Sequence, residues 1–113
     1  MQPIRKGADI AAQEFAACHG GEGAVMCRSL LEGYGGERFA FMHADELLPG
    51  VTIGEHTHAA DEEIYYLVSG SGTLTYDGVQ YPMQAGDVSV CLPGHSHGFA
   101  AAETCSLIVV GSK

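Results

Sequence analysis

Short apolar runs interrupted by Gly, Pro or Asp fill the chain from Ala24 onward. The turn residues recur at intervals of about eight to twelve residues, which is typical of the strands of an all-β sandwich or barrel. The pair Asp77-Gly78 lies between two alternating segments and indicates a two-residue hairpin turn whose backbone needs positive φ. The pattern predicts strands at about 24–31, 38–46, 51–57, 63–69, 72–77, 79–82, 87–92, 97–101 and 104–110.

The N-terminal residues follow a different pattern. Residues 8–17 contain good helix formers and are followed by Gly20-Gly21, which predicts a short helix or an irregular arm over residues 1–23. No helical period competes with the strand pattern after Gly36. A closed or nearly closed β-barrel is the simplest architecture, because closure removes sheet edges that no helix could cover. A chain of 113 residues forms one domain, so we expect a single barrel over residues 24–113.

Composition and charge narrow the functional classes. The formal net charge is −9, and the five Lys and Arg residues form no basic cluster, which excludes binding to nucleic acid or to an anionic membrane. No run approaches the roughly 18 apolar residues of a membrane span, and the first residues lack the apolar run of a signal peptide. We therefore expect a cytoplasmic protein.

The four cysteines have no CxxC spacing, which argues against a zinc ribbon or a redox pair. In a reducing compartment they are expected as free thiols or as small buried hydrophobes. The dipeptide Cys18-His19 could supply two metal ligands, but one such pair is weak support for a site.

Two pairs of histidines carry the strongest chemical signal. Four of the six histidines lie in His56-Thr57-His58 and His95-Ser96-His97, and Asp61-Glu62-Glu63 follows the first pair closely. Residues i and i+2 of a strand face the same way, so His56 and His58 can present two imidazoles to one point. Imidazoles with one carboxylate form a mixed site for a divalent transition metal and leave coordination positions open. An isolated pair of this kind has a simpler explanation as exposed or hydrogen-bonded histidines, so the surrounding spacing matters.

That spacing resembles the two motifs of the cupin superfamily. In the first, Gly50 is followed after five residues by His56-Thr57-His58, after four more by Glu63 and after six more by Gly70. In the second, Gly86 follows Gly70 after fifteen residues and precedes the run that ends in Pro93-Gly94 and His97. Ala101 stands where the second motif often has Asn, and Leu92 where it often has Pro.

The resemblance implies an all-β double-stranded β-helix, that is, a cupin or jelly-roll barrel, with one metal site. The implied ligands of the metal are His56, His58, Glu63 and His97. The resemblance implies one divalent transition ion (Mn, Fe, Ni, Zn or Cu) as this metal. Glu62 is expected to be solvated, and His95 is interpreted as a turn residue or as a neighbour of the ligands.

Residues that share a face with the ligands should surround the site. Tyr65 shares the face of Glu63, Phe99 that of His97, and Phe41 and His43 alternate along the strand that faces a cupin interior. These four are the candidate substrate-pocket residues, although aromatic side chains can equally fill a small barrel. His43 is also the candidate catalytic acid or base, because an imidazole titrates near neutral pH.

Two functions remain open at this point. The chain resembles metal-dependent enzymes that act on a small oxygen-rich molecule with a carboxylate or carbonyl, as dioxygenases, decarboxylases or isomerases do. The alternative is a module that binds or senses a small ligand through the metal without catalysis, because a fold does not determine a function. The expected partners are a small-molecule ligand or substrate and, from the resemblance alone, a second copy of the chain in a homodimer.

Overall fold

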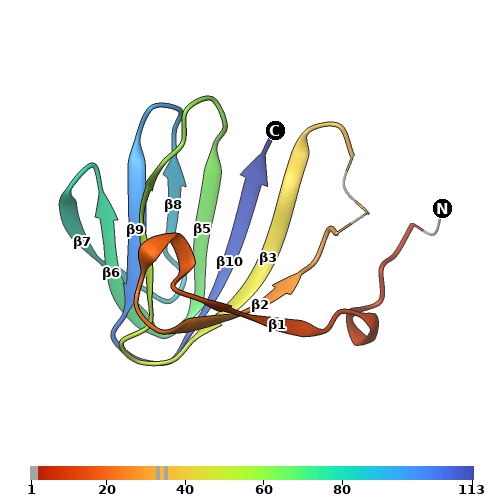
Figure 1. The fold of residues 1–113 in the computed structure, drawn as a ribbon, viewed down its shortest axis with the longest axis horizontal. Coiled ribbons are helices and arrows are strands. Elements are labelled where there is room, and N and C mark those ends of the chain that lie inside the picture. Colours follow the sequence, from red (N-terminus) through yellow and green to blue (C-terminus); the bar gives the residue numbers. More distant parts are fainter. Residues whose placement is uncertain (1–2, 33, 35) are drawn as a thin grey trace.

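The computed structural model describes residues 3–32, 34 and 36–113, and they form two β-sheets that face each other (Figure 1). The larger sheet has six strands in the order β1-β2-β3-β10-β5-β8, and the smaller has four in the order β4-β9-β6-β7. The strands are β1 (Ala12–Ala16), β2 (Ala24–Ser29), β3 (Phe39–Leu47), β4 (Thr52–Thr57), β5 (Glu63–Ser69), β6 (Ser71–Tyr76), β7 (Val79–Gln84), β8 (Val88–Cys91), β9 (Ser96–Ala101) and β10 (Cys105–Ser112).

The nine strands predicted from Ala24 onward are all present, and the double-stranded β-helix is confirmed. The hairpin between β6 and β7 turns at Asp77 and Gly78, whose φ angles of 50° and 80° are the positive values that a two-residue turn needs. Within the described residues, no helix is long and apolar enough to cross a membrane.

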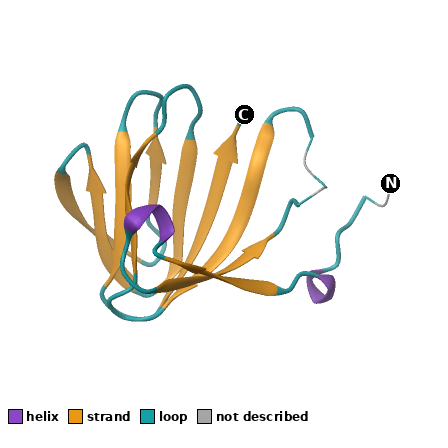
Figure 2. Cartoon of the chain, in the orientation of Figure 1, coloured by secondary structure: helices purple, strands orange, loops and turns teal. Residues whose placement is uncertain are grey.

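Of the two alternatives predicted for the N-terminal arm, the short helix over residues 8–17 is not found. The segment forms β1, which pairs antiparallel with β2, and the helical turns beside it are the 3₁₀ turns η1 (Gly7–Asp9) and η2 (Cys18–Gly20) (Figure 2). Helix propensity differs little among ordinary residues, so the ladder of hydrogen bonds to β2 outweighs it. The N-terminal arm therefore extends the larger sheet.

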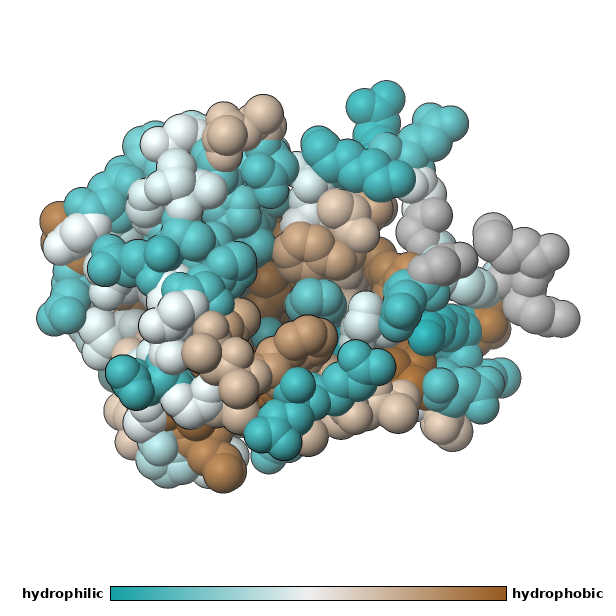
Figure 3. Space-filling model, viewed as in Figure 1, coloured by the Kyte–Doolittle hydropathy of each residue, from teal (hydrophilic) through white to brown (hydrophobic). Residues whose placement is uncertain are grey.

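The core lies between the inward faces of the two sheets. It is built from alternating residues such as Leu107 and Val109 on β10 and Tyr65 and Leu67 on β5, all of them buried. In Figure 3, apolar side chains gather at the centre of the visible face, where the concave side of β3 and β10 is seen, and hydrophilic residues surround them. The metal-site candidates lie at one end of this core.

The turn η2 packs directly on β4. A Cβ atom added to Gly54 would come within 2.0 Å of the carbonyl oxygen of His19, and one added to Gly21 within 2.2 Å of that of Thr52. The two backbones can approach this closely only because both positions are glycine. This contact holds residues 18–20 beside the histidines of β4.

Candidate metal centre

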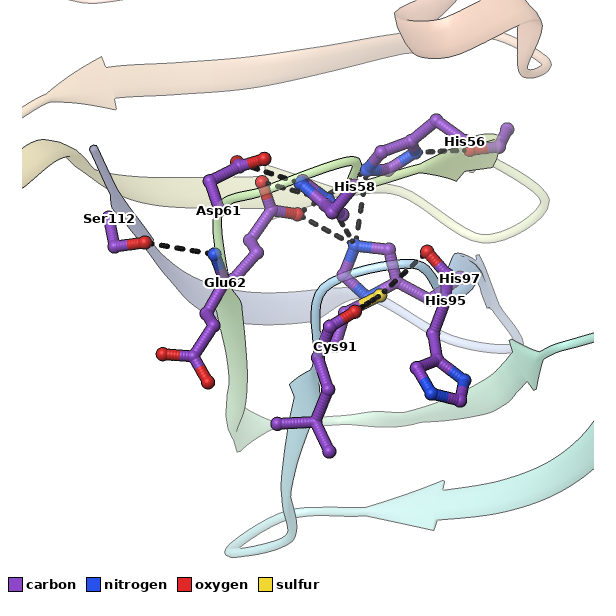
Figure 4. A network of polar contacts seen from close by, with 11 residues as sticks. His56, His58, Asp61, Glu62, Cys91, His95, His97 and Ser112 are labelled. Atoms are coloured by element: carbon purple, nitrogen blue, oxygen red, sulfur yellow. Dashed lines mark hydrogen bonds and ion pairs between the residues drawn. The ribbon is translucent and has the colours of Figure 1, made fainter.

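The structure brings together the four residues that the sequence predicts as metal ligands (Figure 4). His97 Nε2 lies 3.1 Å from His56 Nε2, 3.1 Å from His58 Nε2 and 2.9 Å from Glu63 Oε1. The other carboxylate oxygen of Glu63 lies 3.6 Å from His58 Nε2. Three ring nitrogens and one carboxylate, from β4, the loop after it, β5 and β9, thus converge on one point.

A bulge in β4 makes this convergence possible. Ile53 pairs with Phe99 and His56 pairs with His97, so Gly54 and Glu55 together face the single residue Gly98. The extra residue reverses the alternation, and both Ile53 and His56 point inward. A Cβ atom at Gly98 would lie 2.8 Å from the Ile53 carbonyl oxygen, so a glycine at this position gives the bulge room.

Hydrogen bonds fix the orientation of two of the imidazoles. His56 Nδ1 donates to the carbonyl oxygen of Gly54 at 2.8 Å, and His58 Nδ1 donates to Asp61 Oδ2 at 2.9 Å. Both partners are acceptors, so each Nδ1 carries the hydrogen, and in the neutral rings the lone pair of Nε2 points toward the centre. When protonated, His56 instead donates from Nε2 to Glu63 Oε1, 3.4 Å away. The ring of His97 stacks on Tyr65 with centroids 4.1 Å apart.

The charges of the cluster depend on one carboxylate. Burial alone would raise the pKa of Glu63, but hydrogen bonds from His56 and His97 outweigh it and lower this pKa to about 2. Burial lowers the pKa of His97, which favours the neutral ring that a metal needs. For His56 burial acts in the same direction, but the hydrogen bond to Glu63 prevails and raises its pKa.

The four ligand atoms are better satisfied by a cation than by hydrogen bonds to one another. With His56 and His58 neutral, one hydrogen on His97 Nε2 would have to serve two ring nitrogens and Glu63 Oε1 at the same time. A divalent transition metal accepts all four lone pairs, and imidazole and carboxylate are ligands that Mn, Fe, Ni, Zn and Cu share. The residues therefore fit the ion that the resemblance implies.

Two neighbours of the ligands lie outside the cluster. Glu62 is exposed, as predicted, and its side chain points away from the histidines in Figure 4. His95 is also directed away, and its Nδ1 pairs with Asp77 at the surface. Of the two histidines in His95-Ser96-His97, only His97 reaches the centre.

A small cavity of about 90 Å³ adjoins the cluster. Phe41, His43 and Tyr65, three of the four predicted pocket residues, line it together with His56 and Glu63. The fourth, Phe99, does not: its ring is buried in the core, within 2.5 Å of where a Cβ atom of Gly72 would stand. Phe99 therefore fills the interior of the barrel and does not line the pocket.

Three further titratable side chains, which the sequence did not predict there, line the cavity beside the apolar Ile53 and Val109. Cys18 and His19 come from η2, and the His19 ring stacks on His56 with centroids 3.7 Å apart. The signal available in the sequence was the dipeptide Cys18-His19, which gives no hint that the arm folds back over β4. Asp45 of β3 is the third, and the available signal was its position two residues after His43, which puts both side chains on one face.

Comparisons with known proteins agree on one family. The family model described as the cupin domain matches residues 45–111. An oxalate-binding protein of Thermotoga maritima is 32% identical over 95 residues, which cover 83% of this chain and 78% of that protein.

Solved structures show the same fold. A predicted oxalate decarboxylase from Thermotoga maritima superposes with a TM-score of 0.86 and 26% identity, covering 96% of this chain and 97% of that one. The polyketide cyclase RemF from Streptomyces resistomycificus gives a TM-score of 0.78 with 26% identity, covering 99% of this chain and 80% of that one. The two relatives differ in the activity that their names state.

Proposed function

The chain belongs to the cupin superfamily, and we propose that it is a metal-dependent enzyme that acts on a small oxygen-rich molecule. The observation that carries the proposal is the convergence of His56, His58, Glu63 and His97 beside a cavity. Their donor set fits one divalent transition metal with open coordination positions. When bound, such an ion supplies the positive charge that polarises a carboxylate or a carbonyl group.

The remaining wall residues supply positioning and proton transfer. Tyr65 stacks on His97 and fixes its ring, and His19 does the same for His56. His43 is the proposed acid or base, because its imidazole lines the cavity and contacts Phe41 with ring centroids 4.7 Å apart. Decarboxylation, isomerisation and dioxygenation all need an oxygen-rich substrate held in this way, and oxalate is one candidate substrate because of the relative named for binding it.

A binding module without catalysis is the second candidate. It is favoured by the name of the oxalate-binding relative and by the absence of Lys and Arg among the residues that line the described cavity. Without such a side chain the metal alone would neutralise an anionic ligand. The two candidates share the metal and differ in whether the ligand is converted.

Metal analysis of the purified full-length protein tests the site. We expect about one equivalent of a transition metal in the unmutated protein, and at least a tenfold loss in His97→Ala. His95→Ala is the matched control, because His95 lies two residues away and outside the cluster. The assignment fails if the unmutated protein takes up less than about a tenth of an equivalent from solutions of Mn, Fe, Ni, Zn and Cu.

Turnover separates the two candidate functions. The metal-loaded protein is mixed with oxalate and with small hydroxy acids, and binding, oxygen consumption and product formation are followed together. Conversion that His43→Gln slows while ligand affinity is unchanged supports the enzyme and the role of His43. Binding without conversion of any of these acids supports the module instead.

We also propose a homodimer formed through the outer face of β5 and β8. Neighbouring positions on these paired strands carry exposed apolar side chains, namely Ile64, Tyr66, Val68, Val88 and Val90. Sedimentation velocity at micromolar concentration should show a dimer that Tyr66→Glu dissociates. Tyr81→Glu, at an exposed position on β7 of the other sheet, is the control. A sharp monomer for the unmutated protein contradicts the proposal.

A further inference from the structure

A second cluster of potential ligands faces the barrel interior on β2 and β3. Cys27 and Asp45 are directly opposite each other in the antiparallel ladder, and His43 lies two residues from Asp45 on the same face. One ligand atom from each of the three side chains lies within 4.8 Å of the other two. None of these residues belongs to the His56, His58, Glu63 and His97 cluster.

Asp45 shows that this cluster is chemically incomplete. Its side chain is buried, with 8% of the residue exposed, and among the described residues its Oδ1 has no hydrogen-bond partner. Neither Lys nor Arg forms an ion pair with it in the described part of the chain. A buried carboxylate oxygen without a partner is costly, so a ligand that satisfies it stabilises the folded chain.

The cluster is also accessible. Asp45 and His43 line the cavity of about 90 Å³ that adjoins the first metal centre. Cys27 and His43 line a separate surface groove of about 320 Å³ between the N-terminal arm and β3. A small ion could therefore reach the three side chains without opening the core, which meets the need of a metal site for an entry path.

We propose that Cys27, His43 and Asp45 bind a second, thiophilic divalent cation of the Zn²⁺ class. Thiolate, imidazole and carboxylate are the three ligand types that zinc uses, and three protein ligands leave a fourth position open toward the cavity. Ligands of a tetrahedral zinc lie roughly 3.3–3.7 Å apart, so shifts of about 1 Å would close the cluster around the ion.

Binding at this site has a defined proton balance. The Cys27 thiol gives its proton to solvent and the thiolate sulfur binds the ion, while the carboxylate of Asp45 and a neutral His43 donate lone pairs. Burial and the neighbouring Asp45 raise the pKa of Cys27 to about 12, so the thiol keeps its proton until a cation replaces it. With the second ion bound His43 is a ligand, and its acid–base role belongs to protein that carries the first ion only.

Cobalt(II) is the probe that distinguishes the two centres. The first centre has only nitrogen and oxygen donors, whereas a cobalt ion on Cys27 produces thiolate-to-metal charge-transfer absorption in the near ultraviolet. We expect reduced, metal-free, full-length protein to bind about two equivalents of Co²⁺ and to show this band, which Zn²⁺ then removes because it binds nitrogen and sulfur ligands more tightly than Co²⁺.

Single substitutions test which residues produce the charge-transfer band. Cys27→Ser should lose it together with one equivalent of cobalt, and Asp45→Asn should weaken the binding that produces it at least tenfold. Cys105→Ser is the matched control, because Cys105 is equally buried but bonds to the carbonyl oxygen of Ser71. His97→Ala should keep the band while losing the first ion, so failure of the first centre and failure of the second are distinguishable.

Three results would overturn the second site. The first is the absence of a charge-transfer band in the unmutated protein. The second is a band that persists in Cys27→Ser. The third is a band that disappears in Cys91→Ser, because Cys91 is paired with Glu63 and would then be a sulfur ligand of the first centre. If Cys27→Ser does not fold by circular dichroism, Asp45→Asn provides the decisive titration.

Discussion

Two buried carboxylates line the same cavity in opposite surroundings. Glu63 is 5% exposed and lies among three imidazoles, and hydrogen bonds from two of them hold its pKa near 2 in spite of burial. Asp45 is 8% exposed, and burial raises its pKa, although Cys27 and His43 act against this. Nearly equal burial thus gives opposite results, because neighbouring donors and charges decide which form of a buried acid is stable.

The difference follows from where each strand places its acid. Glu63 is the first residue of β5, at the end of the barrel where the β4 bulge and β9 deliver the histidines. Asp45 lies inside β3 between Cys27 on one neighbouring strand and Leu107 on the other.

Glu63→Gln should have the largest effect. The amide keeps the shape of the side chain but removes the only carboxylate among the four proposed ligands, so metal affinity at the histidine cluster should fall at least about 100-fold. Competition with a chromophoric chelator measures the change. Glu62→Gln is the control, because it removes the same charge from the exposed neighbouring position. Equal losses of metal affinity in both variants would show that the negative charge near the site, and not coordination by Glu63, determines the affinity.

Asp61→Ala should weaken the same centre less. Asp61 does not reach the centre but accepts the hydrogen bond from His58 Nδ1 at 2.9 Å, and the partnership lowers the pKa of Asp61. Removing such a partner of a metal-bound histidine typically lowers metal affinity about 10–100-fold. The same chelator competition applies, with Asp77→Ala as a control acid that pairs with His95 instead. An unchanged affinity would mean that His58 is oriented without Asp61.

Asp45→Asn should act in the opposite direction in metal-free protein. At a pH above the raised pKa of Asp45, the amide removes a buried charge that lacks a partner on Oδ1, so the free energy of unfolding should rise by about 1 kcal/mol. Glu63→Gln should lower the free energy of unfolding under the same conditions. Urea unfolding in the presence of a chelator measures both. If both variants lower the free energy of unfolding, Asp45 and Glu63 do not act in opposite directions on stability.

The pH dependence of these differences follows from the two pKa shifts. Glu63 has a lowered pKa in the folded state, so its contribution is present above its ordinary pKa of 4.5 and is lost as pH falls toward about 2. Asp45 has a raised pKa, so its cost is absent below its ordinary value of 3.8 and grows as pH rises through the folded-state pKa. The advantage of Asp45→Asn should therefore grow with rising pH and disappear by about pH 3.5 in chelator-treated protein. If the stability advantage of Asp45→Asn does not change with pH, its cause is not the ionisation of Asp45.

The contrast also shows what the sequence could predict. The strand pattern and motif spacing were enough for the barrel and for the meeting of His56, His58, Glu63 and His97, because these features are periodic or anchored by turn glycines. The bulge at Gly54 was not predictable, since it depends on the cross-strand glycine at Gly98.

Asp45 and His19 were missed for a related reason. Asp45 gains its chemistry from Cys27, eighteen positions away, through a strand pairing that no local pattern states. His19 reaches His56 only because the arm forms β1, where helix formers predicted a short helix or an irregular arm, and then turns back at η2. Long-range pairing, not local propensity, decided both positions.

His95→Ala should have the smallest effect. His95 and Asp77 form an ion pair whose side chains are 44% and 45% exposed, and such pairs typically contribute less than about 1 kcal/mol. We expect a change in the free energy of unfolding within about 0.5 kcal/mol and unchanged metal content. His97→Ala, which differs in sequence position by only two residues, should lose the metal. If His95→Ala also loses the metal, the turn before β9 must position His97 through this ion pair. The burial of His97 and the exposure of His95 would then not be enough to tell which histidine the metal needs.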